Sequence, residues 1–192
     1  MTSDLFANAI ARIDAANAED PRTEPVGGGG ERPKELVYSK RMSAWIVKLD
    51  PNASEALRLA ARAQHISRWE IPRSDYPMDR AGYYKWRTTL YKFHARKAAE
   101  ILREVGYGAE SIERVESLLQ KKDLKKDPEA QLLEDAACLV FLESYFAEFA
   151  DRDDIDEEKI IDILRKTWRK MSERAHNFAL NLEMPDAASA LV

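Results

Sequence analysis

The sequence has few of the features that mark secreted, membrane-spanning or disulfide-bonded proteins. It contains one cysteine, Cys138, in 192 residues, so an internal disulfide is excluded and a reducing compartment is expected. Its apolar runs are far shorter than the roughly 20 residues that cross a bilayer. The first residues lack the basic stretch and apolar stretch of a signal peptide. We therefore expect a cytoplasmic protein that does not interact with a membrane.

Several well-known site motifs are absent as well. The sequence has no Cys/His zinc spacing, no His-Glu-x-x-His and no Gly-x-Ser-x-Gly. The glycine run at 27–30 lacks the Lys-Ser/Thr ending of a phosphate-binding loop, so we assign it no ligand. No run alternates between apolar and polar residues in the manner of a strand, which favours an all-α protein.

Helical periodicity and punctuation by proline and glycine divide the chain into three parts. Residues 1–33 are predicted to form an N-terminal helix and a flexible glycine-rich linker. Residues 34–182 are predicted to form a single helical domain, and residues 183–192 a flexible tail. The helices are expected at 4–18, 33–49, 51–69, 80–105, 111–122, 128–150 and 157–182.

Two adjacent carboxylates, Glu134 and Asp135, stand in the middle of the apolar segment 132–142. A buried carboxylate is costly unless it is paired, hydrogen-bonded or bound to a cation. Two of the three histidines, His65 and His94, lie on predicted helices upstream. This combination suggests a metal site or an acid/base site, and the alternative is a buried salt bridge to an arginine.

Charge is distributed unevenly along the chain. Residues 62–103 carry a net charge of +6, which leaves −10 for the rest of a chain whose net charge is −4. A basic segment in an acidic protein favours a local anion site over a broad nucleic-acid surface. The alternative is that these arginines pair with acidic segments of the same fold.

Residues 64–87 are rich in side chains that bind anions and stack on flat ligands. On the helix expected at 80–105, a polar and cationic stripe lies beside an apolar stripe formed by Tyr83, Trp86, Leu90 and Phe93, as in one wall of a cleft. The alternative is a solvated face. The residues of the polar stripe are Arg80, Tyr84, Arg87, Tyr91 and His94. The predicted substrate-binding residues are Arg68, Trp69, Arg73, Arg80, Tyr84, Trp86 and Arg87.

Motifs spread over the chain resemble a family catalogued as domain of unknown function 4202. They are Gln64-His65-Ile-x-Arg68-Trp69-x-Ile-Pro72-Arg73, then Gly82-Tyr83-x-x-Trp86-Arg87, Phe93-His94-Ala95 and Gln131-x-Leu-Glu134-Asp135. The resemblance extends from about residue 35 to 180. It implies no particular activity.

A second and more distant resemblance is to the HD-domain phosphohydrolase superfamily of helical proteins. His65, His94 and Asp135 occupy the places of three of its metal ligands. In that superfamily the histidine at the place of His65 is followed by an aspartate, and here Ile66 replaces that aspartate. The resemblance implies a bundle of about six to seven helices and a divalent metal held by these three residues.

Together these observations predict a hydrolase of a phosphorylated or other anionic, nucleotide-like small molecule. His65, His94, Asp135 and Glu134 are the predicted catalytic residues, acting either through a metal-bound water or through general acid/base chemistry. The predicted arginines would bind the charge of the substrate. The alternative function is a non-catalytic module that binds an anion, a nucleotide or a short RNA through the same surface.

Overall fold

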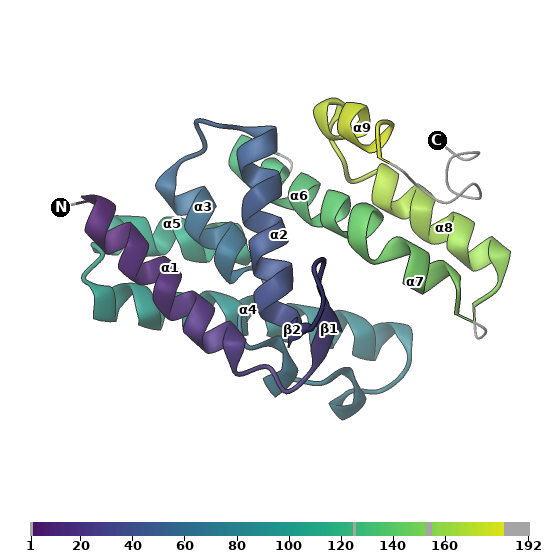
Figure 1. The fold of residues 1–192 in the computed structure, drawn as a ribbon, viewed down its shortest axis with the longest axis horizontal. Coiled ribbons are helices and arrows are strands. Elements are labelled where there is room, and N and C mark those ends of the chain that lie inside the picture. Colours follow the sequence, from purple (N-terminus) through teal and green to yellow (C-terminus); the bar gives the residue numbers. More distant parts are fainter. Residues whose placement is uncertain (1, 125, 153–154, 183–192) are drawn as a thin grey trace.

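The structure, a computed structural model, describes residues 2–124, 126–152 and 155–182 (Figure 1). Most of this part of the chain is helical, which confirms the all-α class. None of its helices is both long enough and apolar enough to cross a membrane. The helices are α1 (Thr2–Ala18), α2 (Lys34–Leu49), α3 (Glu55–Ala63), α4 (Arg80–Val105), α5 (Ala109–Leu119), α6 (Pro128–Ser144), α7 (Phe146–Ala150), α8 (Glu157–Trp168) and α9 (Glu173–Ala179), with short 3-10 helices η1 (Arg68–Glu70) and η2 (Arg73–Asp75).

Three of the expected helices are shorter or divided, because a serine caps the chain at a new point in two of them and the backbone leaves helical geometry in the third. Ser54, rather than Asp50, caps α3 by accepting a hydrogen bond from the backbone N–H of Leu57. Tyr145 leaves helical geometry and separates α6 from α7. Ser172 caps α9, so the segment expected to be one helix at 157–182 forms α8 and α9.

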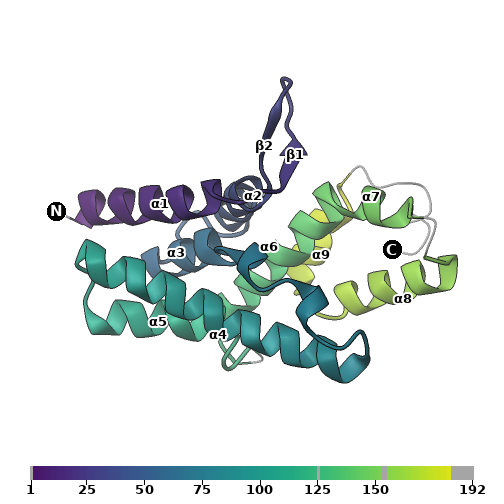
Figure 2. The same cartoon turned by 90° about the horizontal axis from the view of Figure 1, so that it is seen from below.

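The segment expected to be a flexible linker forms a small hairpin instead. Strands β1 (Thr23–Pro25) and β2 (Glu31–Pro33) pair antiparallel, and the hairpin projects from the helical body (Figure 2). Three glycines at 28–30 have positive φ, which lets the chain reverse between the strands. At its base, the Asp20 carboxylate accepts hydrogen bonds from Arg22 and from the backbone N–H of Glu35. The hairpin is therefore fixed to the start of α2.

The core lies among α1 to α6, where α1 packs against α2, α3 and α4, α4 packs against α3 and α5, and α2, α3 and α5 pack against α6. Helix α1 is part of this body, because Ala9 and Ile13 are fully buried. Small side chains on α3 and on the second half of α4 let these helices pack closely against α5, and larger ones fill the remaining space. Burial of each large apolar side chain contributes about 1.5–3 kcal/mol. The small residues are Ala60, Ala61, Ala63, Ala95, Ala98 and Ala99, and the large ones include Ile13, Met42, Ile46, Leu57, Leu102 and Leu133.

The first half of α4 extends beyond this core and, with the loop 64–79, lines one side of a cavity. Gly82 lets the loop pack closely against this half of α4. A Cβ atom at Gly82 would lie 2.1 Å from the carbonyl oxygen of Pro77. The backbone N–H of Gly82 also donates to Asp79 Oδ1 at 2.7 Å, which caps the helix.

We expect Gly82→Ala to destabilise the protein by about 1–3 kcal/mol, the usual cost of forcing extra volume into a packed site. Gly27→Ala is the matched control, because no atom lies within 4 Å of a Cβ at Gly27. Its effect should stay within about 0.5 kcal/mol. Urea unfolding measures both variants, and equal stabilities for the two would contradict the close approach of loop and helix.

Candidate functional site

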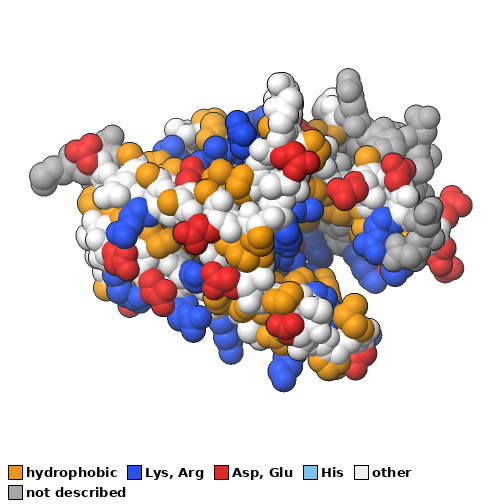
Figure 3. All heavy atoms as spheres, turned by 60° about the horizontal axis from the view of Figure 1, so that its bottom comes forward, with side chains coloured by type: hydrophobic (Ala, Val, Ile, Leu, Met, Phe, Trp, Pro, Cys, Tyr) orange, Lys and Arg blue, Asp and Glu red, His pale blue; other side chains and the backbone are white. Residues whose placement is uncertain are grey.

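A cavity of about 240 Å³ lies between α4, α6 and the turn that follows α8, and we call it the site cavity. The molecule is hollowed on the face shown in Figure 3, where Lys and Arg side chains border the hollow. The cationic residues that line the site cavity are Arg68, Arg87, Lys121 and Lys170. Its other polar residues include Gln64, His65, His94 and Glu134, and its aromatic ones are Tyr38, Tyr83, Trp86, Tyr91 and Phe141.

The turn between α3 and η1 places two of these side chains. Ile66 is fully buried and anchors the turn in the core. Ser67 has a left-handed backbone, with φ 52° and ψ 32°, which non-glycine residues adopt only where neighbouring contacts fix it. Its N–H donates to Asn17 Oδ1 at 3.3 Å. The reversal leaves His65 and Arg68 side by side, with 2.9 Å between Arg68 Nη1 and His65 Nε2.

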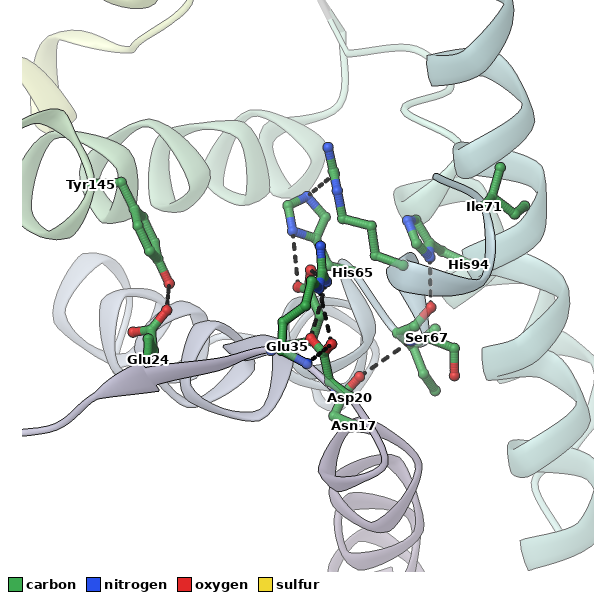
Figure 4. Close-up of polar contacts among 12 residues, drawn as sticks. Asn17, Asp20, Glu24, Glu35, His65, Ser67, Ile71, His94 and Tyr145 are labelled. Carbon is green, nitrogen blue, oxygen red and sulfur yellow. Dashed lines mark hydrogen bonds and ion pairs between the residues drawn. The ribbon is translucent and has the colours of Figure 1, made fainter. Parts of the chain in front are cut away.

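His94, on α4, contacts this turn and has a defined tautomer (Figure 4). Its Nδ1 lies 2.8 Å from the carbonyl oxygen of Ile66, and because a carbonyl only accepts, Nδ1 carries the proton. Burial, followed by the neighbouring His65, lowers the pKa of His94 to about 3, so the ring is neutral at pH 7. Nε2 is therefore an unprotonated acceptor, and it is buried without a hydrogen-bond partner in the described part of the chain.

His65 has both ring nitrogens engaged. A guanidinium only donates, so Nε2 accepts the hydrogen bond from Arg68. Nδ1 lies 3.4 Å from Glu35 Oε2, a contact that Figure 4 also shows. The ring stacks on Tyr38 with 4.1 Å between centroids, and its centroid lies 5.9 Å from that of His94. The two histidines chosen from the sequence thus share one site.

Positive charge dominates the site cavity. Four cationic side chains line it against one carboxylate, that of Glu134. Burial, and then the charges of Arg68 and Lys121, hold the pKa of His65 well below 6.5. Protonation of either histidine is therefore unfavourable, because it adds a further cation to the group.

Within the described residues, neither arginine of the site cavity has a carboxylate in direct contact. In the ranges that the structure describes, no carboxylate lies within ion-pair distance of Arg68 or Arg87. Arg87 donates to the hydroxyl of Tyr83 at 3.2 Å and to that of Tyr91. Arg68 lies over the Trp86 ring, 4.9 Å from its centroid. Arg87 therefore keeps its charge available to a ligand, whereas the charge of Arg68 is partly balanced by the nearby buried carboxylate of Glu35.

Glu134 pairs with lysines rather than with a metal or an arginine. It forms an ion pair with Lys121, and Lys170 Nζ lies 3.9 Å from its Oε1. Burial raises the pKa of this carboxyl, but the charge and hydrogen bond of Lys121 together with the charges of Lys170 and Arg87 outweigh burial, and the pKa is lowered. The buried ion pair that the sequence left open as an alternative is thus formed, with lysines as partners.

A family model described as Domain of unknown function (DUF4202) matches residues 7–192. The chain belongs to this family. Searches of curated proteins and of solved structures gave no match. Membership in the DUF4202 family confirms the first resemblance but assigns no chemistry to the site, and the HD-like relationship stays a prediction.

Asp135 lies away from the two histidines. Its Oδ2 accepts from Ser172 Oγ at 2.6 Å, and its Oδ1 accepts from the Ser172 backbone N–H and from Gln131 Nε2, both at 2.8 Å. The side chain is fully buried and does not line the site cavity. Asp135 thus fixes the start of α9 to α6 in this DUF4202 protein.

The predicted donor set does not fit a divalent metal in this arrangement. Both nitrogens of His65 face protein groups, and the carboxylate of Asp135 is taken by Ser172 and Gln131. Of the three predicted metal ligands, only His94 has a donor atom, Nε2, without a hydrogen-bond partner in the described ranges. Over the described residues, no group of three or more His, Cys, Asp or Glu side chains could hold a metal.

The predicted substrate-binding residues divide into two groups. Three of them, Arg68, Trp86 and Arg87, line the site cavity. Trp69 and Arg73 line a neighbouring depression, where Arg73 donates to the backbone carbonyls of residues 76, 77 and 79 and thereby holds the loop. Arg80 and Tyr84 lie outside the cavity, with the Arg80 guanidinium 5.6 Å from the Tyr84 ring centroid.

Sequence reasoning missed several residues of the site cavity. Lys121 and Lys170 lie in turns, where no periodic pattern connects them to α4. Lys121 has a left-handed backbone, with φ 55°. Tyr38 and Gln64 stand on or beside helices whose apolar stripes gave no sign of a cavity. The single available signal was the position of Gln64 directly before His65.

We expect Asp135→Ala to lower the free energy of unfolding by about 1.5–3 kcal/mol, because it removes hydrogen bonds to a buried charged group. Anion affinity should stay unchanged, since Asp135 does not line the site cavity. Asp162→Ala is the control, because its ion pair with Lys166 is exposed and contributes little. A loss of ligand binding without a loss of stability would contradict this assignment.

The depressed histidine pKa values predict an acid-sensitive fold. The unfolded histidine titrates near 6.5 and folded His94 near 3, so stability is lost as the pH falls below about 6.5. The free energy of unfolding should fall by up to about 1.4 kcal/mol per pH unit per histidine. Burial raises the carboxyl pKa of Glu35, so the contribution of Glu35 to the free energy of unfolding decreases as the pH rises.

Urea unfolding of wild type and His94→Asn between pH 7 and 5 isolates the contribution of His94. The asparagine can still donate to the Ile66 carbonyl, but it has no imidazole to titrate. The variant should therefore show a shallower pH dependence than wild type. Parallel curves for the two proteins would show that His94 titrates normally.

Proposed function

We propose that this protein binds a small phosphorylated, or otherwise anionic, molecule in the site cavity. The observation that carries the proposal is the excess of four cationic side chains over one carboxylate among the residues that line it. Like charges that converge in a partly buried site repel one another, so a bound anion relieves a cost that the fold already bears. A phosphate group fits this field, because guanidinium and ammonium groups donate charge-assisted hydrogen bonds to it.

The dimensions favour a small ligand. A volume of about 240 Å³ lies below the range of about 300–1,000 Å³ typical of pockets for drug-sized molecules. A phosphorylated metabolite is therefore a better fit than a dinucleotide or a segment of RNA. The net charge of −4 also opposes a broad nucleic-acid footprint.

Hydrolysis of the bound molecule is the second candidate, and the open lone pair of His94 favours it. Nε2 could accept a proton from a water that attacks a phosphate ester, since no other ring nitrogen of the site is free. A pKa of about 3 makes this nitrogen a weak base, which is why binding is the leading function. A bound dianion would raise this pKa and strengthen the base.

We expect inorganic phosphate to raise the melting temperature of the protein at constant ionic strength, because it binds the folded state. Arg87→Met should weaken phosphate binding by roughly 10-fold to 100-fold, the equivalent of about 1.5–3 kcal/mol for a hydrogen bond to a charged group. Arg80→Met is the matched control, because it removes the same charge from the same helix outside the site cavity.

Equal losses of phosphate affinity in Arg87→Met and Arg80→Met would contradict the proposal. They would show that phosphate affinity depends on the net charge of the protein and not on the residues of the site cavity. Phosphate release from ester substrates, measured with and without a chelator, then separates hydrolysis from binding. Turnover that survives the chelator and is lost in His94→Asn would support the metal-free hydrolase. Binding without turnover would support the binding module.

A further inference from the structure

Two buried polar atoms of the site cavity have no partner in the described residues, and both are acceptors. One is His94 Nε2, whose residue is 2% exposed, and the other is Gln64 Oε1, whose residue is 6% exposed. Both residues line the site cavity. Buried polar groups in native proteins are almost always hydrogen-bonded, so each unpaired acceptor indicates a donor supplied from outside the chain.

A phosphate oxygen is the wrong group for this position. An anionic oxygen only accepts, and His94 Nε2 is held as an acceptor because Nδ1 donates to the Ile66 carbonyl. An ammonium group would supply donors, but the charges of Arg68 and Arg87 oppose another cation there. A neutral hydroxyl satisfies both conditions, since it donates a hydrogen bond and carries no charge.

The helix separates the acceptor end of the site cavity from its cationic end. Arg87 and His94 lie seven residues apart on α4, and at 1.5 Å per residue this places them about 10 Å apart along the helix axis. Lys170 lies toward solvent, with its side chain 45% exposed, whereas His94 is buried. The cavity thus has a buried end that carries the two acceptors, beside Arg68, and a basic end that donates, formed by Arg87, Lys121 and the more exposed Lys170.

We propose that the ligand is a small phosphorylated polyol, of the sugar-phosphate class, whose hydroxyl groups donate to His94 Nε2 and Gln64 Oε1 while its phosphate contacts Arg87, Lys121 and Lys170. This inference rests on the proposed function, because it takes the phosphate site as given and names the rest of the ligand. Hydroxyl recognition by buried acceptors gives strong discrimination, since a ligand without the hydroxyl leaves the acceptors unpaired.

Glycerol 3-phosphate and n-propyl phosphate are matched probes, since they differ by two hydroxyl groups on the same carbon chain. Isothermal titration calorimetry of the full chain should show at least tenfold tighter binding of glycerol 3-phosphate. In His94→Asn and Gln64→Leu this ratio should fall toward one, because the affinity for glycerol 3-phosphate falls toward that for n-propyl phosphate. His94→Asn retains a donor for Ile66, and Gln64→Leu provides an independent variant should the first one fold poorly.

The outcomes separate the two proposals. Equal affinity for the two probes in wild type would overturn the polyol inference and leave the phosphate site standing, with water as the partner of the two acceptors. No binding of either probe, or of inorganic phosphate, would overturn the proposed function itself. A ratio that persists in both variants would place hydroxyl recognition elsewhere and also overturn the inference.

Discussion

The hydrogen bond from His94 Nδ1 to the Ile66 carbonyl is the contact on which the site depends. It connects the middle of α4 to the turn after α3, and both elements contribute residues that line the cavity. In this turn Ile66 is buried in the core and Ser67 has a left-handed conformation, which places Arg68 beside His65. The same hydrogen bond fixes the His94 tautomer, because it keeps the proton on Nδ1 and leaves Nε2 as an acceptor in the cavity.

Crowding of cations around two neutral histidines makes the site responsive to charge. Burial and the surrounding charges disfavour the protonated form of each ring, which leaves hydrogen-bond acceptors where histidines often supply positive charge. A bound anion would offset the repulsion between Arg68 and Arg87 and would raise both histidine pKa values. If the proposed anion binds, its binding and the protonation of the histidines are coupled, and the ligand makes the site more basic.

The parts of the structure that follow from local periodicity were predictable, and those that follow from contacts between distant segments were not. Arg87 and His94 share a face of α4 because seven residues span about two turns, so their common cavity was visible in the sequence. The partner of Asp135, Ser172, lies 37 residues away in a turn, where no pattern marks it. The hairpin at 23–33 likewise forms from a segment whose glycines predicted flexibility.

Glu134 and Asp135 show that residue type alone does not determine which partner a buried carboxylate contacts. Both are buried carboxylates on α6, yet adjacent residues on a helix point about 100° apart, so they face different neighbours. Glu134 faces the cavity and holds two lysines there, whereas Asp135 faces α9 and holds its first turn. The sequence required that each carboxylate be compensated, and tertiary packing decided the partner. The prediction that both carboxylates act in catalysis was based on residue type, and it gave one role to two side chains that the fold separates.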